Sequence, residues 1–117
     1  MPAHLTADLL DVPEPALRDV QLLRALLVAA AGAVGLGPLA MPTVHDGPHA
    51  TALTLVSDGR HIVVHALPEE GVLLLDVLAP AVQDSQRALD VFTRRLTPRD
   101  VRSDTRERPP RHHRPRG

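Results

Sequence analysis

The sequence has no cysteine, no tryptophan and no tyrosine, and Phe92 is the one aromatic residue among its 117. The lack of cysteine excludes disulfides, thiolate metal sites and thiol catalysts. The lack of aromatic residues means that Leu, Val and Ala must build the core, and these side chains supply less buried area per residue than aromatic ones. All 13 basic residues are arginine, which we interpret as a bias of the coding sequence rather than as a functional signal.

Long apolar runs and targeting signals are also missing. The longest apolar-rich stretch, residues 20–39, is interrupted by Gln21 and Arg24 and contains glycines and a proline, so it does not fit a membrane span. The N-terminus has no basic segment followed by an apolar core, so we expect no secretory signal and a cytoplasmic protein. The chain length fits a single domain.

Charge divides the chain into two parts. Residues 1–98 carry 11 acids and 6 arginines, whereas residues 99–117 carry 3 acids and 7 arginines. The end of the second part, RERPPRHHRPRG, has no apolar residue to support folding. We therefore predict a domain over residues 1–98 and a disordered, Arg/Pro-rich tail over residues 99–117. Because no aromatic residue is interleaved with these arginines, nucleic acid is not the expected partner.

The spacing of apolar residues predicts a mixture of strands and helices. The predicted strands cover residues 4–12, 50–57, 60–67 and 71–80, and the predicted helices cover residues 15–31 and 85–96. An Asp-Gly turn joins the second and third strands, which predicts a β-hairpin. We also consider an edge strand within residues 37–49 and a last short strand near Val101. The order favours an α+β fold, a two-layer sandwich with a largely antiparallel sheet and two helices on one face.

Two histidines four residues apart, His61 and His65, lie in one predicted strand. They share a face of that strand, but about 13 Å separates them at about 3.3 Å per residue. One metal ion cannot bind both, and the β-branched run between them argues against a helix that would bring them together. We therefore predict no metal site. Taken alone, a strand histidine is most often structural, although imidazole suits general acid–base chemistry.

The segment SDGRHIVVHALPEEG and the following VLLLDVLAP resemble the signature of the bacterial S-adenosylmethionine decarboxylases, approximately S-E-S-H-x-x-x-H-T-W-P-E-x-G and then a strand ending in D-x-F-T-C-G. The likeness covers roughly residues 4–97. The family implies a chain that cleaves itself before a serine, which becomes a pyruvoyl group. That group bonds the substrate amine and accepts electrons when the carboxylate leaves. The family also implies a role in spermidine (polyamine) biosynthesis, dimers, and silent paralogues that activate a catalytic subunit.

The sequence departs from this pattern at the residues that carry the chemistry. Arg60 stands where the resemblance places the precursor serine, and Pro80 stands where it places a proton-donating cysteine. Arginine has no β-hydroxyl for the acyl shift that precedes pyruvoyl formation, so we expect no pyruvoyl cofactor here.

Other positions agree with the resemblance. It implies that His65 and Thr51 are remnants of the self-processing machinery, His65 as the histidine that assists cleavage and Thr51 as a nearby hydroxyl. We expect His61, Glu69 and Asp76 to bind a small molecule that resembles S-adenosylmethionine.

Two functions stay open. In the first, the chain is a non-catalytic or regulatory paralogue that forms a homodimer or a heterodimer with an intact family member. In the second, it is an enzyme: either a decarboxylase of S-adenosylmethionine or an amino acid that uses a shifted Ser57 as pyruvoyl precursor, or a pocket that uses His61, His65 and Asp76 for another reaction. The missing serine and cysteine favour the first function.

Overall fold

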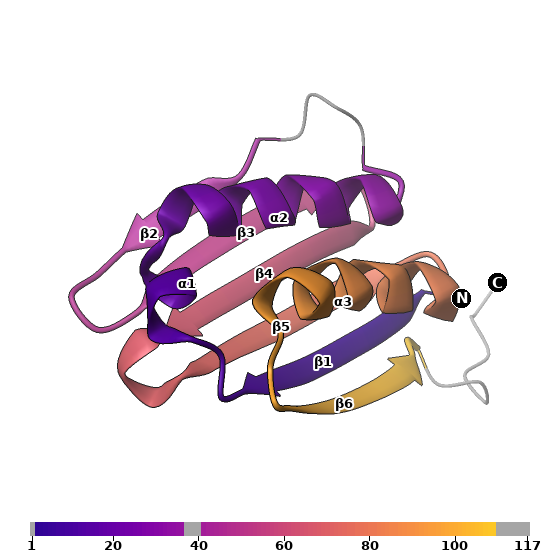
Figure 1. Ribbon diagram of the computed structural model, residues 1–117. Helices are drawn as coiled ribbons and strands as arrows, with labels where there is room; N and C mark the ends of the chain where they lie inside the picture. Colours follow the sequence, from indigo (N-terminus) through magenta and orange to yellow (C-terminus); the bar gives the residue numbers. More distant parts are fainter. Residues whose placement is uncertain (1, 37–40, 110–117) are drawn as a thin grey trace, which may run out of the picture.

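The computed structural model describes residues 2–36 and 41–109, which form one antiparallel sheet with helices packed on one face (Figure 1). The strands are β1 (Ala3–Leu10), β2 (Thr43–Asp46), β3 (Thr51–Ser57), β4 (Arg60–Leu67), β5 (Val72–Ala79) and β6 (Asp100–Glu107). The helices are α1 (Glu14–Arg18), α2 (Val20–Ala33), α3 (Val82–Leu96) and the short 3-10 helix η1 (Pro68–Glu70). The sheet order is β2-β3-β4-β5-β1-β6. The predicted α+β two-layer fold is confirmed.

The predicted first helix is two helices in the structure, with a break at Asp19. The backbone of Asp19 is not helical, and its side-chain Oδ1 accepts a hydrogen bond of 3.0 Å from the backbone N–H of Leu22. Aspartate at this position satisfies one of the amides that the first turn of α2 leaves without a partner. The apolar spacing runs across the break, which is why periodicity alone predicts one helix.

The core lies between the sheet and the two long helices. Alternate residues of each central strand, such as Leu5, Ile62 and Val77, are fully buried on this side. Phe92 of α3 is buried with them, and nearly all the other large core side chains are leucine. Each such leucine contributes about 1.5–3 kcal/mol when fully buried, so a core with a single aromatic residue is sufficient only because so many leucines share it.

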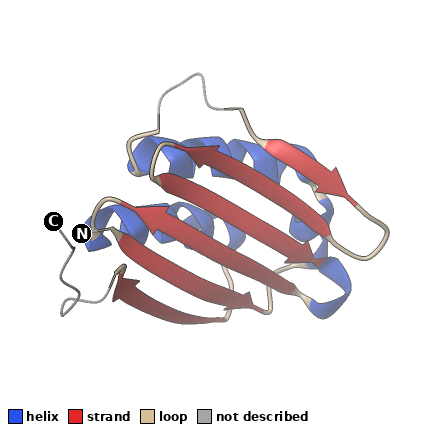
Figure 2. Cartoon of the chain, turned by 180° about the vertical axis from the view of Figure 1, so that it is seen from behind, coloured by secondary structure: helices blue, strands red, loops and turns tan. Residues whose placement is uncertain are grey.

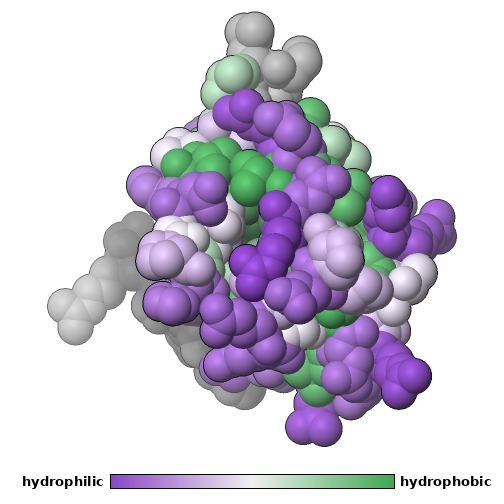
Figure 3. All heavy atoms as spheres, turned by 60° about the vertical axis from the view of Figure 1, so that its left-hand side comes forward, coloured by the Kyte–Doolittle hydropathy of each residue, from purple (hydrophilic) through white to green (hydrophobic). Residues whose placement is uncertain are grey.

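The other face of the sheet carries no helix among the described residues, and we call it the open face (Figure 2). It presents the remaining alternate residues of each strand, which are a mixture of polar and apolar side chains. Val56 is 72% exposed and Leu74 is 38% exposed on this face. The end of the molecule that carries α1 and η1 is mostly hydrophilic, with small apolar patches (Figure 3). None of the described helices is long and apolar enough to cross a membrane.

Part of the predicted disordered tail is a strand. Residues 100–107 form β6, which pairs with β1 along its whole length, from Leu10 with Asp100 to Ala3 with Glu107. Beyond the strand, the backbone N–H of Arg108 donates a hydrogen bond of 2.8 Å to the carbonyl of Pro2. The short strand considered near Val101 is therefore present and longer than expected. Composition alone predicts disorder here because main-chain hydrogen bonds hold β6, and these do not require apolar side chains. Residues 110–117 lie outside the described residues.

Deleting residues 100–117 should lower the free energy of unfolding by about 3 kcal/mol or more, because each main-chain hydrogen bond contributes about 1 kcal/mol. Urea denaturation of the two proteins measures the loss. The control is a deletion of residues 110–117, which leaves β6 in place. If the longer deletion is no more destabilising than the shorter one, β6 does not support the fold.

Candidate functional site

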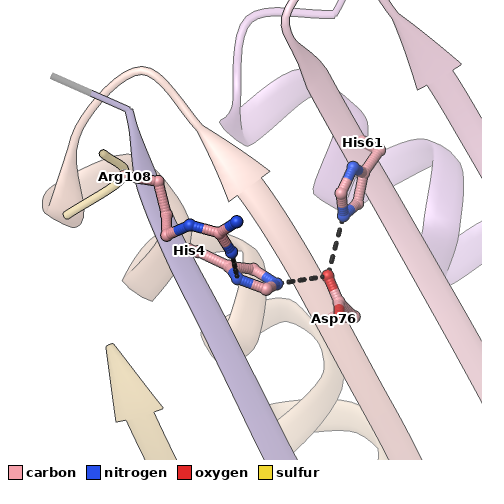
Figure 4. Close-up of polar contacts among 4 residues, drawn as sticks. All are labelled: His4, His61, Asp76 and Arg108. Carbon is pink, nitrogen blue, oxygen red and sulfur yellow. Dashed lines mark hydrogen bonds and ion pairs between the residues drawn. The ribbon is translucent and has the colours of Figure 1, made fainter. Parts of the chain in front are cut away.

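Three polar side chains from three adjacent strands meet on the open face (Figure 4). His61 of β4 and His4 of β1 both pair in register with Leu78 of β5, one from each side. Asp76 lies two residues before Leu78 and therefore points to the same face. Its carboxylate reaches the space between the two imidazoles, and we call these three residues the His–Asp–His cluster.

Both imidazoles of the cluster bind the same carboxylate oxygen. The Nε2 atom of His61 lies 2.7 Å from Oδ1 of Asp76, and the Nε2 atom of His4 lies 2.9 Å from it. The two rings meet edge to face, at 78° and with 6.1 Å between their centroids. Since an ionised carboxylate only accepts hydrogen bonds, both Nε2 atoms must be the donors.

Arg108 determines which nitrogen of His4 carries the proton. Its Nη1 atom lies 3.0 Å from Nδ1 of His4. A guanidinium only donates hydrogen bonds, so Nδ1 must accept with its lone pair. The single proton of the His4 ring is then on Nε2, where it is donated to Asp76. The contacts thus run in one direction, from Arg108 through a neutral His4 to the carboxylate.

Two opposing effects act on the pKa of Asp76. Burial raises it, but the hydrogen bonds from His61 and His4 and the electrostatic effect of these two rings lower it more. The pKa of Asp76 is therefore below its ordinary value, and the carboxyl group is ionised at neutral pH.

Two hollows border the cluster, and their volumes are about 380 Å³ and about 320 Å³. The first is lined by Pro2, His4, His61, Leu78, Arg108 and Pro109. The second lies along the open face beside Val63, His65 and Leu74 and also includes His61 and Asp76. Both volumes fall in the range of sites for small molecules, and His61 is shared by the two.

Of the three residues expected to bind a ligand, the structure brings two together. His61 and Asp76 are in contact. Glu69 lies in η1, beyond the opposite end of β4, and the strand between them separates it from His61 by about 20 Å. Its carboxylate instead lies 3.6 Å from Nδ1 of the exposed His49.

The structure does not bring together the two residues expected to assist self-processing. Thr51 is buried on the helix-covered face, where its hydroxyl donates a hydrogen bond of 2.7 Å to Oδ1 of Asp46. His65 is exposed on the open face, opposite Ala52 of β3. The sheet itself therefore lies between the Thr51 hydroxyl and the His65 imidazole.

The region expected to carry the precursor serine is the turn between β3 and β4. Ser57 pairs with Arg60 across this turn, and Gly59 has a φ of +67° that an L side chain rarely adopts. By alternation with Ile62, the Arg60 side chain points to the helix-covered side, where it lies beside Gly35 after the end of α2. Pro80 follows β5 at the same end of the sheet.

Sequence reasoning missed His4 and Arg108. His4 is 72 positions from Asp76 in the chain, and Arg108 is 104 positions from His4. Alternation along the first strand places His4 on one face, but only the strand order β4-β5-β1 makes it a neighbour of Asp76. Arg108 belonged to the segment predicted to be disordered.

Known proteins share this architecture. The crystal structure of the adenosylmethionine decarboxylase from Aquifex aeolicus VF5 superposes with a TM-score of 0.81 and 25% sequence identity, over 92% of this chain and 90% of that chain. The fold is therefore that of an adenosylmethionine decarboxylase.

Sequence comparison agrees with the structural likeness. The S-adenosylmethionine decarboxylase proenzyme of Symbiobacterium thermophilum is 32% identical over 73 residues, which is 62% of this chain and 55% of that protein. The chain thus spans little more than half the length of this relative. The S-adenosylmethionine decarboxylase family matches residues 3–109. The chain belongs to that family.

Asp76→Asn tests the electrostatics of the cluster. The pKa of Asp76 is lower in the folded chain than in the unfolded one, so the ionised carboxylate stabilises the fold above the unfolded-state pKa. This stabilisation is lost as the pH falls through the folded-state value. Between about pH 5 and about pH 3, the free energy of unfolding should therefore fall more steeply in the wild type than in the variant. Urea denaturation at each pH measures both slopes.

The matched control is Asp58→Asn, which removes an exposed carboxylate from the β3–β4 turn and leaves the cluster intact. Its pH dependence should follow that of the wild type. Equal slopes for the wild type and Asp76→Asn would mean that the cluster does not hold the carboxylate in its ionised form.

Proposed function

We propose that this chain is a non-catalytic member of the S-adenosylmethionine decarboxylase family, a cytoplasmic protein that acts in polyamine (spermidine) biosynthesis by pairing with an intact family member. The observation that carries this proposal is Arg60 at the start of β4, in the position where the resemblance places the pyruvoyl precursor. Under this proposal the chain has the family fold but does not cleave itself to form a pyruvoyl group.

The residues at the β3–β4 turn do not fit a pyruvoyl group. Formation of that group needs a β-hydroxyl on the residue at position 60, and a guanidinium side chain has none. The Nε atom of Arg60 is also buried without a hydrogen-bond partner among the described residues, so the side chain occupies the space at the end of the core.

Ser57 is a poor substitute for the missing precursor. It is exposed at the end of β3, and alternation with Leu55 directs it to the helix-covered side. His65 lies on the open face, about 16 Å along β4 from the residue that pairs with Ser57. This histidine is therefore too far from Ser57 to assist a cleavage there.

The open face supports the pairing part of the proposal. Its centre is a mixture of apolar residues, including the exposed Val56 and Leu74, and of the partly buried His–Asp–His cluster. Two sheets that stack face to face lie about 10 Å apart and bury such side chains between them. The two hollows on this face would then lie near the contact between subunits, where a ligand that resembles S-adenosylmethionine could bind beside the negative charge of Asp76.

Intact-mass spectrometry tests the absence of self-processing. The purified protein should give one species near 12.6 kDa, and a carbonyl-reactive reagent should add nothing to it. Ser57→Ala should behave identically, because Ser57 is not a precursor. Two fragments from a cut within residues 56–60, with a reactive carbonyl on the C-terminal fragment, would show that the chain is an enzyme of the usual kind.

Mixing experiments test the pairing. Added to an intact decarboxylase from the same genome, the chain should form a complex by size-exclusion chromatography with light scattering and should raise decarboxylation per catalytic subunit. Leu74→Arg should weaken the complex, because it places a charge at the centre of the open face. Val28→Arg, on the exposed side of α2, is the control and should pair normally. The absence of any complex, with the activity of the intact enzyme unchanged, would overturn the proposal.

A further inference from the structure

The His–Asp–His cluster has the composition and the spacing of a metal site. One ligand atom from each of His4, His61 and Asp76 lies within 4.8 Å of the other two. Two imidazole nitrogens and a carboxylate oxygen are a donor set that Zn²⁺ favours, often with water as the fourth ligand. We propose that this cluster binds one zinc ion through Nε2 of each histidine and Oδ1 of the aspartate, and that Arg108 opposes this binding.

The distances require only a small adjustment. The two nitrogens lie 2.9 Å and 2.7 Å from Oδ1. In a tetrahedral zinc site with bonds of about 2.0–2.1 Å, neighbouring ligand atoms lie about 3.3 Å apart. Side-chain movements of about half an ångström therefore bring the two nitrogen–oxygen distances to those of a coordinated site. The two Nε2 atoms lie within 4.8 Å of each other and must also approach to about 3.3 Å. The ligands come from three paired strands, which hold them more firmly than loops would.

The cluster is also accessible to an ion from solution. The side chains of His4, His61 and Asp76 are 20%, 30% and 39% exposed. The larger hollow, of about 380 Å³, is lined by both histidines and leaves room for a water molecule at the fourth position. This proposal departs from the prediction that the chain has no metal site. That prediction was based on the distance between His61 and His65, and His65 is not part of this cluster.

The protons of the two rings determine how zinc would compete with the existing contacts. Zinc replaces the proton on each Nε2 atom, and a neutral imidazole then carries its single proton on Nδ1. For His61 this change meets no donor among the described residues. For His4 it points an N–H group at Nη1 of Arg108, which lies 3.0 Å away and is itself only a donor.

Arg108 must therefore leave its place when zinc binds. Its positive charge also repels the ion. A histidine that binds a metal normally donates its other N–H group to an acceptor, and replacing such a partner changes affinity by about 10–100-fold. Glutamine at position 108 offers an amide oxygen that can accept from Nδ1–H and removes the charge. Arg108→Gln should therefore bind zinc at least about tenfold more tightly than the wild type.

Isothermal titration of the full chain with zinc chloride at neutral pH tests the proposal, after treatment with a chelator and desalting. We expect one zinc ion per chain at the cluster, and a loss of affinity of about tenfold or more in both His61→Asn and Asp76→Asn. His65→Asn is the matched control, because His65 lies on the same face outside the cluster and should leave binding unchanged. Circular dichroism establishes that each variant is folded.

Two further measurements separate this site from zinc bound elsewhere. Deleting residues 110–117 removes the histidine pair at positions 112 and 113 and should leave the affinity unchanged. Cobalt(II) in place of zinc should give the visible absorption of a tetrahedral site in the wild type and in Arg108→Gln, and this absorption should be absent from His61→Asn. Affinity that does not depend on His61 and Asp76, or no gain in Arg108→Gln, would overturn the proposal.

Discussion

The packing of α2 and α3 against one face of the sheet is the constraint on which the rest of the structure depends. Side chains alternate along a strand, so burying Leu5, Ile62 and Val77 under the helices fixes their neighbours on the open face. His4, His61 and Asp76 are such neighbours, and they meet only because the buried positions are in register across β4, β5 and β1. A shift of one residue in any of these strands would turn one member of the cluster into the core, and the apolar residues prevent that shift.

Much of the fold follows from the sequence because the strong signals are local. The hairpin of β3 and β4 follows from an Asp-Gly turn between two alternating runs, and α3 follows from apolar residues that include Phe92. The break at Asp19 was missed because the helix-capping hydrogen bond does not disturb the apolar spacing. The short strand considered near Val101 is part of β6. The full length of β6 was missed because its main-chain bonds to β1 replace the apolar side chains on which composition depends.

The site shows the same division between local and long-range information. The proximity of His61 and Asp76 could be predicted from the sequence, because the two residues lie on strands that are consecutive in the chain. Thr51 and His65 lie in paired strands as well, but the register sets Thr51 opposite Ala66, so the two side chains point to different faces. The role of His4 depends on the pairing of the first strand with β5. Such pairing is a property of the whole sheet and has no signal near residue 4.

Arg60 lies in a different part of the sheet from the His–Asp–His cluster. Its side chain points toward the helix-covered layer near Gly35, whereas the His–Asp–His cluster lies on the open face. The two regions share β4 but no side-chain contact appears between them among the described residues. A different residue at position 60 would therefore leave the hydrogen bonds around Asp76 in place. Because the cluster needs only the register of three strands, its geometry does not depend on which residue stands at position 60.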